Sequence, residues 1–445
     1  MKSCYNIHIH TRITVSLSER TIMAKERRDS KNRLLWKGEY QKEDGRYMYR
    51  YTDASGKTGY VYSWTLTKSD RPPKGRDPGP CLRDLEKKIQ QDINDGIKTK
   101  EADSITINDY FELYLKQKVN IKPTTRANYR RNFDKHLKER IGHRAISSLR
   151  YSDVKQCYRS ILEDENLSIA TLSNIDATLS PILTLAVRDC LIRNNPASGA
   201  FSEIKRLASK PPEVREALTL EEQTAFVNFL YSSNSCKRWR PMFTVLLGTG
   251  IRVGEACALT WDDCDFEKNV IHIKRTLSYY PEEHTRKCEY HLLTPKTAAG
   301  VRTIPMLGEV RRVLKEERVR QLREGFSTAE LEGVSGFIFS SQQGGLCNSK
   351  HVNAALYRIT EAYNKKEADD AKREARTPVL LPKFSVHVLR HTFCTRMCEN
   401  GMNLRVLQEV MGHSKITMTM DVYTTVTDSY RSEAFGKIDG SIKIV

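Results

Sequence analysis

The stretch Ser385-Val386-His387-Val388-Leu389-Arg390-His391-Thr392 holds two histidines and an arginine at helical spacing. On a helix, His387, Arg390 and His391 share one face, and Leu389 begins an apolar stripe on the opposite face. A helix that buries one face and presents imidazoles and a guanidinium on the other is suited to binding phosphate. The pattern alone is weak, because 11 histidines and 73 lysines and arginines give about two His-x-x-basic matches by chance.

Three further motifs lie in the same half of the chain. Arg252 and Glu255, in Gly-Ile-Arg-Val-Gly-Glu, are three residues apart, so on a helix Glu255 could orient Arg252 or balance its charge. His413, in Met-Gly-His, precedes Tyr423, which is one of 20 tyrosines. Lys296, in Thr-Pro-Lys-Thr, lies on a turn between two strand candidates, from which it can swing toward a leaving oxygen. Taken singly, each of these residues is most often an ordinary surface or packing residue.

The order of the motifs favours one chemistry. Cutting a phosphodiester without a metal requires a nucleophile, a cationic cradle for the developing charge, a proton donor for the leaving oxygen and a proton acceptor for the nucleophile. Tyrosine, arginine, lysine and histidine can fill these roles. All of them follow one another within the last half of the chain.

The composition indicates a polyanionic partner. The 445 residues include 73 Lys and Arg against 55 Asp and Glu, which gives 73 − 55 = +18. Such an excess favours nucleic acid first and a membrane surface second, whereas the plainer interpretation is charge that serves solubility only. The length predicts two to four domains, each able to bury a core.

The 11 cysteines contain no Cys-x-x-Cys pair, so we expect reduced thiols, no disulfides and no structural metal. No run of about 18 apolar residues predicts a transmembrane helix. Residues 1–22 lack the apolar core of a secretory signal, and we expect a disordered leader there, with Met23 as a natural start.

Residues 23–100 predict a small β-rich domain. Aromatic residues alternate with basic or apolar ones over residues 45–51 and again over 60–64, and Asp-Gly and Ser-Gly turns flank the first run. Three short strands cannot bury much apolar surface, so the amphipathic segment 82–89 is expected to pack on the sheet as a helix.

Residues 104–200 predict a helical bundle. One apolar stripe at helical spacing follows Ile107, Phe111 and Leu115. Pro196 is expected to end the bundle, and residues 201–215 to form a linker.

Residues 216–430 predict a mixture of helices and short strands. The strand candidates are residues 270–273, 290–293 and 302–305, and the charged segment 362–383 is expected to be a surface excursion. The fold class is therefore a multi-domain α+β protein. It has an N-terminal three-stranded sheet plus helix, a helical bundle, and a mostly helical third domain with a small antiparallel sheet.

Together the motifs resemble those of the tyrosine recombinase (phage-type integrase) family, and in particular the integrases of conjugative transposons. The resemblance spans roughly residues 245–425 and is weaker over the β-rich and helical regions. It implies a site-specific recombinase that cuts and rejoins DNA to integrate and excise a mobile element. The positions that match the catalytic residues of the family are Arg252, Lys296, His387, Arg390, His413 and Tyr423, with Glu255 and His391 in supporting positions.

The resemblance also implies a role for each position. Tyr423 would attack the scissile phosphate and form a 3′-phosphotyrosyl link, Lys296 would protonate the departing 5′ oxygen, and His387 would act in proton transfer. The link preserves the energy of the broken bond, so no ATP, metal or other cofactor is implied. Lys274 also lies near a strand end and is the alternative to Lys296.

The remaining positions would hold the phosphate. Arg252 and Arg390 would bind its non-bridging oxygens, His413 would hydrogen-bond one of them, and Glu255 would occupy a supporting acidic position.

The family architecture implies three DNA-binding roles. Residues 23–100 would bind arm-type sites, 104–200 the core site, and 216–430 would be catalytic, with 431–445 as a tail exchanged between subunits. The expected DNA contacts are Arg46, Tyr49, Lys57 and Tyr62 in the first region and Arg126, Arg130, Arg131 and Lys135 in the second.

The implied partners are double-stranded DNA with core and arm sites, three further copies in a tetramer on two DNA sites, and an accessory excisionase. No membrane is expected, and the expected location is the cytoplasm of a prokaryote, at the nucleoid. The alternatives are a type IB-like topoisomerase, for which an arm-site domain has no use, and a catalytically inactive DNA-binding regulator.

Overall fold

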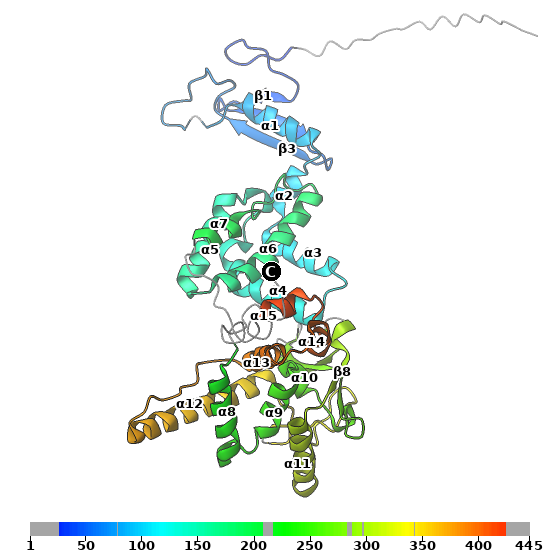
Figure 1. The fold of residues 1–445 in the computed structure, drawn as a ribbon. Helices are drawn as coiled ribbons and strands as arrows, with labels where there is room; N and C mark the ends of the chain where they lie inside the picture. Colours follow the sequence, from blue (N-terminus) through cyan, green and yellow to red (C-terminus); the bar gives the residue numbers. More distant parts are fainter. Residues whose placement is uncertain are drawn as a thin grey trace, which may run out of the picture. The chain divides into compact units, whose positions relative to one another are not determined.

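A computed structural model describes residues 26–77, 79–207, 217–282, 287–295, 298–341 and 343–423. The predicted leader 1–22 and the predicted tail 431–445 lie outside these residues. The chain divides into two compact units, which we call unit 1 (Met1–Ser209) and unit 2 (Lys210–Val445). Figure 1 colours them in chain order, from blue to red.

Unit 1 begins with a three-stranded antiparallel sheet in the order β1 (Glu39–Gln41), β2 (Tyr47–Thr52) and β3 (Thr58–Ser63). Gly45 and Gly56 adopt φ values of 86° and 81° in the two connecting turns, which an L side chain rarely tolerates. Helix α1 (Leu82–Asn94) packs on one face of the sheet (Figure 1) and buries Leu82 and Ile89.

The strand period decides which tyrosines of this sheet are buried. Tyr47, Tyr49 and Tyr51 all point toward α1, because alternate residues of a strand share a face. Tyr49 is 4% exposed, and its hydroxyl accepts a hydrogen bond from Gln90 Nε2 at 2.6 Å. The burial of Tyr49 argues against its predicted DNA contact, whereas Tyr62 on β3 is 44% exposed.

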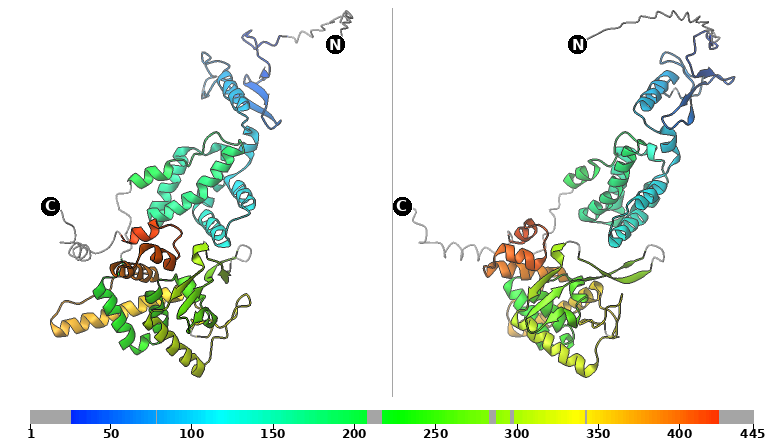
Figure 2. Two further views of the ribbon diagram at one scale, coloured as in Figure 1. Left: turned by 45° about the vertical axis from the view of Figure 1, so that its right-hand side comes forward. Right: turned by 90° about the vertical axis from the view of Figure 1, so that its right-hand side faces the viewer.

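The rest of unit 1 is a helical bundle around one apolar core (Figure 2). Phe111 and Phe133 stack at its centre with ring centroids 3.8 Å apart. Its elements are α2 (Thr99–Ser104), α3 (Ile107–Gln117), α4 (Pro123–Asn132), the π-helical segment η1 (Phe133–Gly142), the 3-10 turn η2 (Ile146–Ser148), α5 (Tyr151–Glu165), α6 (Ile169–Arg188) and α7 (Ala200–Leu207).

The bundle extends beyond its predicted end at Pro196. Helix α7 occupies the start of the segment predicted as a linker, because Ala200 and Ile204 are buried against the same core. Pro196 lies in the connection from α6 to α7 and terminates neither the core nor the unit.

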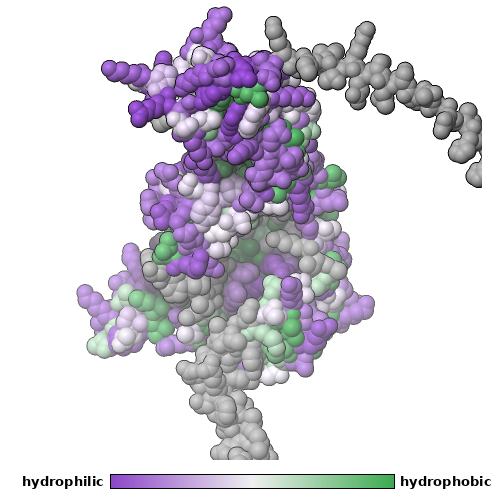
Figure 3. Space-filling view, turned by 90° about the horizontal axis from the view of Figure 1, so that it is seen from above, coloured by the Kyte–Doolittle hydropathy of each residue, from purple (hydrophilic) through white to green (hydrophobic). Residues whose placement is uncertain are grey.

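Helix α6 is the one helix among the described residues that is long and apolar enough to cross a membrane. Its apolar face, including Leu172, Leu179 and Leu183, is fully buried in the bundle core, so α6 is a core helix of this bundle. The surface seen in Figure 3 is largely hydrophilic, with hydrophobic residues in small separate areas.

Unit 2 is mostly helical and contains two small antiparallel sheets, β4-β5-β8 and β6-β7. Its strands are β4 (Cys264–Asp265), β5 (Val270–Ile273), β6 (Thr276–Pro281), β7 (Cys288–Leu293) and β8 (Arg302–Pro305). Its helices are α8 (Leu220–Ser232), α9 (Arg240–Thr249), α10 (Val253–Cys257), α11 (Gly308–Glu324), α12 (Ser349–Glu374), α13 (Val386–Glu399), α14 (Leu404–Met411) and α15 (Thr417–Tyr423), with the 3-10 turns η3 (Asn234–Cys236), η4 (Trp261–Asp263) and η5 (Ala298–Gly300).

The predicted fold class is confirmed, and each of the three strand candidates lies within a strand of unit 2. The charged segment 362–383 lies mostly on the surface, as predicted, and its first half is helical, because α12 continues to Glu374. Its buried side chains Tyr363 and Ala371 hold that half against the unit. The returning chain is fixed to the helix by two hydrogen bonds between Asn364 and Leu381, both 2.8 Å long.

Opposite faces of the N-terminal sheet should respond differently to truncation. We expect Tyr49→Ala to lower the local free energy of unfolding of the sheet by about 3 kcal/mol or more, because it empties a buried site. Tyr62→Ala should lower it by less than about 1 kcal/mol, because Tyr62 is half exposed. Hydrogen exchange of the amides of β2 and β3 measures both values, and equal losses would contradict the assigned faces.

Candidate active site

A buried carboxylate organises the predicted site. Glu255 is 2% exposed, and its two oxygens bind two arginines: Oε1 accepts from Arg252 Nη1 at 2.9 Å, and Oε2 accepts from Arg302 Nη2 at 2.9 Å. Burial alone would raise the pKa of Glu255, but the hydrogen bonds and charges of the two arginines lower it below its ordinary value. The carboxylate is therefore ionised and neutralises part of a cationic cluster.

The start of α10 places Arg252 and Glu255 together. Arg252 is the N-cap residue of α10, and its backbone N–H donates to Glu255 Oε2 at 2.9 Å, as in a capping box. The two residues were predicted to lie on one helical face. In the structure Arg252 is the residue just before α10, so it lies at the end of the helix and not on one of its faces.

Arg302 is a member of the cluster that sequence reasoning missed. It opens β8, is nearly buried, and its Nε donates to Val410 O at 2.6 Å while its Nη1 donates to Gly300 O at 3.0 Å. It thereby ties β8 to α10 and α14. Its only local signal is an arginine at the start of a strand, which is indistinguishable from an ordinary surface arginine.

Arg390, on α13, is 3% exposed and is held by backbone carbonyls. Its Nη1 donates to Gly250 O at 2.6 Å and its Nη2 to Met411 O at 2.5 Å. No carboxylate hydrogen-bonds it among the residues that the structure describes. Burial first, and then the charge of Arg252, lowers the pKa of Arg390 to about 9. An anion that bound here would compensate the positive charge of Arg390, which burial makes unfavourable.

Two glycines allow the backbone to approach these arginines. Gly250 ends α9 at φ 63°, and a Cβ there would lie 2.3 Å from Phe393 Cδ1. Gly412 ends α14 at φ 64°, where a Cβ would lie 2.9 Å from Ala299 O. Both positions require glycine for conformation and for space.

His413 follows Gly412 and is held from both sides. Its backbone N–H donates to Gln408 O at 3.1 Å, and its Nδ1 lies 2.9 Å from Thr419 Oγ1. Burial first, and then the charges of the neighbouring arginines, lowers the pKa of His413 to about 3, so the ring is neutral. In the tautomer that accepts the Thr419 hydroxyl at Nδ1, the Nε2–H is left to donate to a ligand.

The other two histidines lie on α13, as their spacing predicted. The rings of His387 and His391 meet edge to face with centroids 5.0 Å apart. His391 directly follows Arg390 on α13. The structure thus brings Arg252, Glu255, Arg390 and His413 together through contacts with each other or with adjoining backbone.

Two further predicted residues are the nucleophile, Tyr423, and the lysine, Lys296. Tyr423 is the last residue of α15, a helix that packs against α13 and α14, but its side chain lies outside what the structure describes. Lys296 also lies outside the described residues. Its alternative, Lys274, forms an ion pair with Asp263 at 3.1 Å, and Arg275 binds the same carboxylate. Lys274 is thus occupied by a structural partner.

The predicted DNA contacts of the sheet, apart from Tyr49, lie on its surface. Lys57 is exposed in the β2–β3 turn. The guanidinium of Arg46 lies 5.6 Å from the centroid of the Tyr62 ring, and Lys42 Nζ lies 5.0 Å from it, so cations and an exposed aromatic ring share one patch. Arg46 also forms an ion pair with Asp44 at 2.7 Å.

The four predicted contacts of the bundle differ in availability. Arg131 and Lys135 are exposed, and Lys135 Nζ lies 3.5 Å from Glu165 Oε2. Arg130 is paired with Glu112 and stacks 5.0 Å from the Phe111 ring centroid. Arg126 donates to Lys118 O at 3.1 Å. Two of the four side chains therefore already serve the packing of the bundle.

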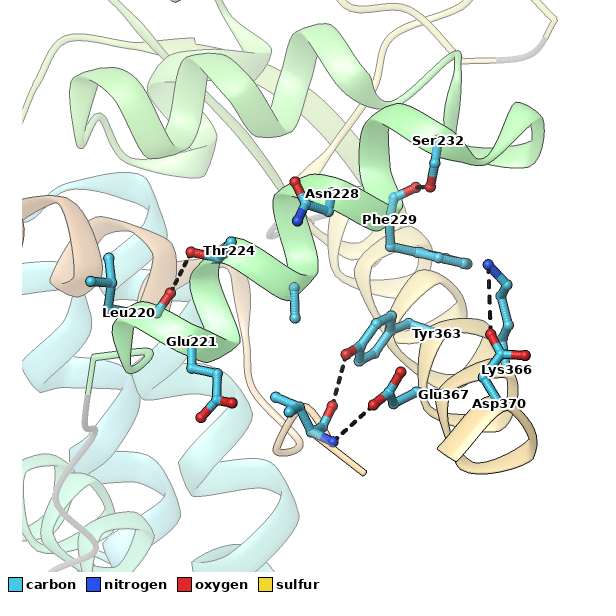
Figure 4. A pocket seen from close by; sticks show the side chains of 12 residues that line it. Leu220, Glu221, Thr224, Asn228, Phe229, Ser232, Tyr363, Lys366, Glu367 and Asp370 are labelled. Atoms are coloured by element: carbon cyan, nitrogen blue, oxygen red, sulfur yellow. Dashed lines mark hydrogen bonds and ion pairs between the residues drawn. The ribbon is translucent and has the colours of Figure 1, made fainter. Parts of the chain in front are cut away.

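A pocket of about 650 Å³ lies elsewhere in unit 2, between α8 and α12 (Figure 4). None of the six predicted catalytic residues lines it. Some of its polar groups bond to the protein, as when Tyr363 Oη donates to Val379 O at 2.8 Å. Among the described residues, no group of three or more His, Cys, Asp or Glu side chains is arranged to hold a metal ion.

Comparison with known families matches three segments of the chain. The phage integrase family matches residues 216–429, the DNA-binding domain of Tn916 integrase matches residues 23–93, and the SAM-like N-terminal domain of phage integrases matches residues 106–162.

Individual proteins match over most of the chain. The transposase of transposon Tn1545 from Streptococcus agalactiae is 30% identical over 412 residues, which cover 92% of this chain and 96% of that protein. The transposase of transposon Tn916 from Enterococcus faecalis has the same identity and coverage. The integrase of transposon Tn1549, solved in complex with transposon right end DNA, has a TM-score of 0.63 and 29% identity, and the match covers 76% of this chain and 100% of that one.

Removing the charge of Glu255 should destabilise unit 2. We expect Glu255→Gln to lower the local free energy of unfolding by about 3 kcal/mol or more, because the nearly buried Arg302 loses its counterion. Glu309→Gln is the matched control, since Glu309 is 72% exposed in its ion pair with Arg312, and it should change stability by less than about 1 kcal/mol. Hydrogen exchange of α10 and β8 amides measures the difference, and equal effects would contradict the role of Glu255.

Proposed function

The chain belongs to the phage integrase family, as a tyrosine recombinase of the conjugative-transposon integrase type, and on that premise we propose that Tyr423 is its nucleophile and that the Glu255 cluster binds the scissile phosphate. The protein is a site-specific recombinase that cuts and rejoins double-stranded DNA to integrate and excise a transposon. The residue assignment is supported above all by the burial of Arg390, whose guanidinium has no carboxylate bound to it among the described residues.

The covalent step follows from the nucleophile. Tyr423 Oη attacks the phosphorus, the bond from phosphorus to the 5′ oxygen breaks, and a 3′-phosphotyrosyl link forms. Religation reverses the step with a 5′ hydroxyl as the nucleophile. One ester replaces another at each stage, so the phosphorus–oxygen bond energy is retained and no ATP is consumed.

The arginines supply the electrostatic part of catalysis. Arg390 uses two of its five N–H donors on backbone carbonyls, and Arg252 uses one on Glu255 and one on Gly412 O, so both keep donors for the non-bridging oxygens. Because the protein already fixes them, little reorganisation is needed when negative charge develops in the transition state. The lowered pKa of Arg390 supports this role, since an anionic phosphate stabilises the charged form.

Four other residues provide hydrogen bonding and proton transfer. Neutral His413 donates its Nε2–H to a phosphate oxygen, and its buried ring supports this role. His387, on the same helix as Arg390, acts in proton transfer at the nucleophile, with His391 supporting it. Lys296 protonates the departing 5′ oxygen, a role that rests on its place in the family pattern.

Each segment has a proposed share of DNA binding. The region 23–100 binds arm-type sites through Arg46, Lys57 and Tyr62, and the bundle 104–200 binds the core site with Arg131 and Lys135 as its exposed cations. The region 216–430 is catalytic, and the tail 431–445 is exchanged between subunits of a tetramer on two DNA sites. An accessory excisionase controls direction, and the protein acts at the nucleoid in the cytoplasm of a prokaryote.

The nucleophile can be tested with a nicked suicide substrate that carries the core site. The unsubstituted chain should accumulate a covalent protein–DNA adduct, and Tyr423→Phe should form none because it lacks the attacking oxygen. Tyr357→Phe is the matched control, since Tyr357 is an exposed tyrosine on α12, and it should leave the adduct unchanged. Denaturing gels score the adduct, and its formation by Tyr423→Phe would refute the assignment.

The DNA-binding face of the sheet can be tested by charge removal. Arg46→Ala/Lys57→Ala should weaken arm-site binding about tenfold, because two phosphate-contacting cations are lost. Lys87→Ala/Lys88→Ala removes the same charge from exposed positions of α1 and should weaken it far less. Gel shifts with arm-site DNA compare the two, and equal losses would contradict recognition through the sheet.

A further inference from the structure

A second pocket of unit 2 carries no role in the chemistry described so far. It has a volume of about 920 Å³ and is lined from separate elements. Arg238 and Trp239 come from the segment between η3 and α9, Tyr290 from β7, and His351 and Arg358 from α12. None of the residues that form the Glu255 cluster lines it.

The lining of this pocket is basic and contains no carboxylate. Arg238, Arg358 and His351 line it, but no Asp or Glu does. The α8–α12 pocket of Figure 4 differs, since Glu221, Glu367 and Asp370 line it. The charge of this pocket is therefore a local feature and does not merely follow the net charge of the chain.

The two arginines keep most of their donors. Arg238 is exposed, and its Nη2 donates to Ser340 O at 2.9 Å. Arg358 is also exposed, and its Nε makes a long contact of 3.3 Å to Ala354 O in its own helix. Neither forms an ion pair with a carboxylate among the described residues. Two guanidinium groups from different elements, both without an anionic partner there, are suited to a phosphate.

Two aromatic rings of the pocket are held in place. Tyr290 Oη donates to Leu346 O at 3.2 Å and accepts from Asn348 Nδ2 at 3.0 Å, which fixes the ring. Trp239 is half-buried, with its ring centroid 6.1 Å from that of Phe243. A fixed aromatic side chain beside arginines can stack a nucleobase without sequence preference.

Apolar residues of α12 also line the pocket. They are Ala354, Ala355 and Ile359, and Cys347, which is 1% exposed, lines it as well. A hydrogen bond with Cys257 and, against the cost of burial, the charge of Arg238 lower the pKa of Cys347.

We propose that this pocket binds a nucleotide, with its phosphate on Arg238 and Arg358 and its base against Trp239 or Tyr290. A volume of about 920 Å³ is large enough for one such ligand. The same chemistry is offered by a free nucleotide and by an unpaired nucleotide of a DNA strand. The site is distinct from the proposed cleavage site and its occupancy requires no cleavage.

Calorimetric titration of the full chain with AMP tests the site. We expect saturable binding of one AMP per chain, and Arg238→Ala/Arg358→Ala should weaken it at least about tenfold, because charge-assisted hydrogen bonds are lost. Lys315→Ala/Arg323→Ala removes the same charge from exposed positions of α11 and should leave the affinity within about twofold.

Ribose 5-phosphate tests the part of the proposal that concerns the base. It carries the same phosphate without an aromatic ring and should bind at least about tenfold more weakly than AMP, since stacking of one base contributes about 1–3 kcal/mol. Equal binding of the two ligands would make the pocket a general anion site and would overturn the nucleotide assignment.

A single-stranded oligonucleotide of eight adenines distinguishes the two sources. If it binds and displaces AMP, the ligand is a nucleotide of a DNA strand; if AMP binds and resists displacement, the ligand is a free nucleotide. Absence of binding by both probes, or undiminished binding of both by Arg238→Ala/Arg358→Ala, would refute the site. These titrations need no active nucleophile, so their failure leaves the assignment of Tyr423 untouched, and a failed adduct assay leaves the pocket untouched.

Discussion

The buried ion pairs of Glu255 are the constraint on which the arrangement of unit 2 depends. Arginines do not gather in a protein interior unless their charge is compensated, because removing each charge from water costs several kcal/mol. Glu255 compensates Arg252 and Arg302 together, at 2.9 Å each, and leaves Arg390 to be satisfied by carbonyls and by a ligand. Three arginines share one carboxylate, so the cluster carries two positive charges in excess, which a bound phosphate can neutralise.

Backbone geometry brings distant segments to that cluster. Helices α9 and α14 both end in a glycine with positive φ, and the carbonyls around those ends accept from Arg390, Arg252 and Arg302. Residues separated by 160 positions in the chain thus share one site. Helix termini serve this purpose well because their last carbonyls have no partner within the helix. His413, one residue past such an end, is positioned by the same chain reversal.

Sequence reasoning succeeded where the information is local. Helical spacing identified the His/Arg/His face of α13, and turn residues with alternation identified the sheet of unit 1. It failed where long-range packing decides: Arg302 acquires its role from Glu255, which is 47 residues away, and no local pattern encodes that pairing. Tyr49 and Tyr62 both looked like surface aromatics, and only strand pairing and the position of α1 showed which face is buried. Helix α7 lay beyond a proline that looked like a terminator.

The central claim is that the Glu255 cluster and Tyr423 act on one phosphate. A structure of the chain covalently joined to a cleaved core-site strand tests it most directly. We expect the phosphorus to be bonded to Tyr423 Oη, with its non-bridging oxygens within about 3 Å of guanidinium nitrogens of Arg252 and Arg390 and of His413 Nε2. A phosphate bonded to any other side chain, or one that lies outside hydrogen-bonding reach of both arginines, would contradict the account.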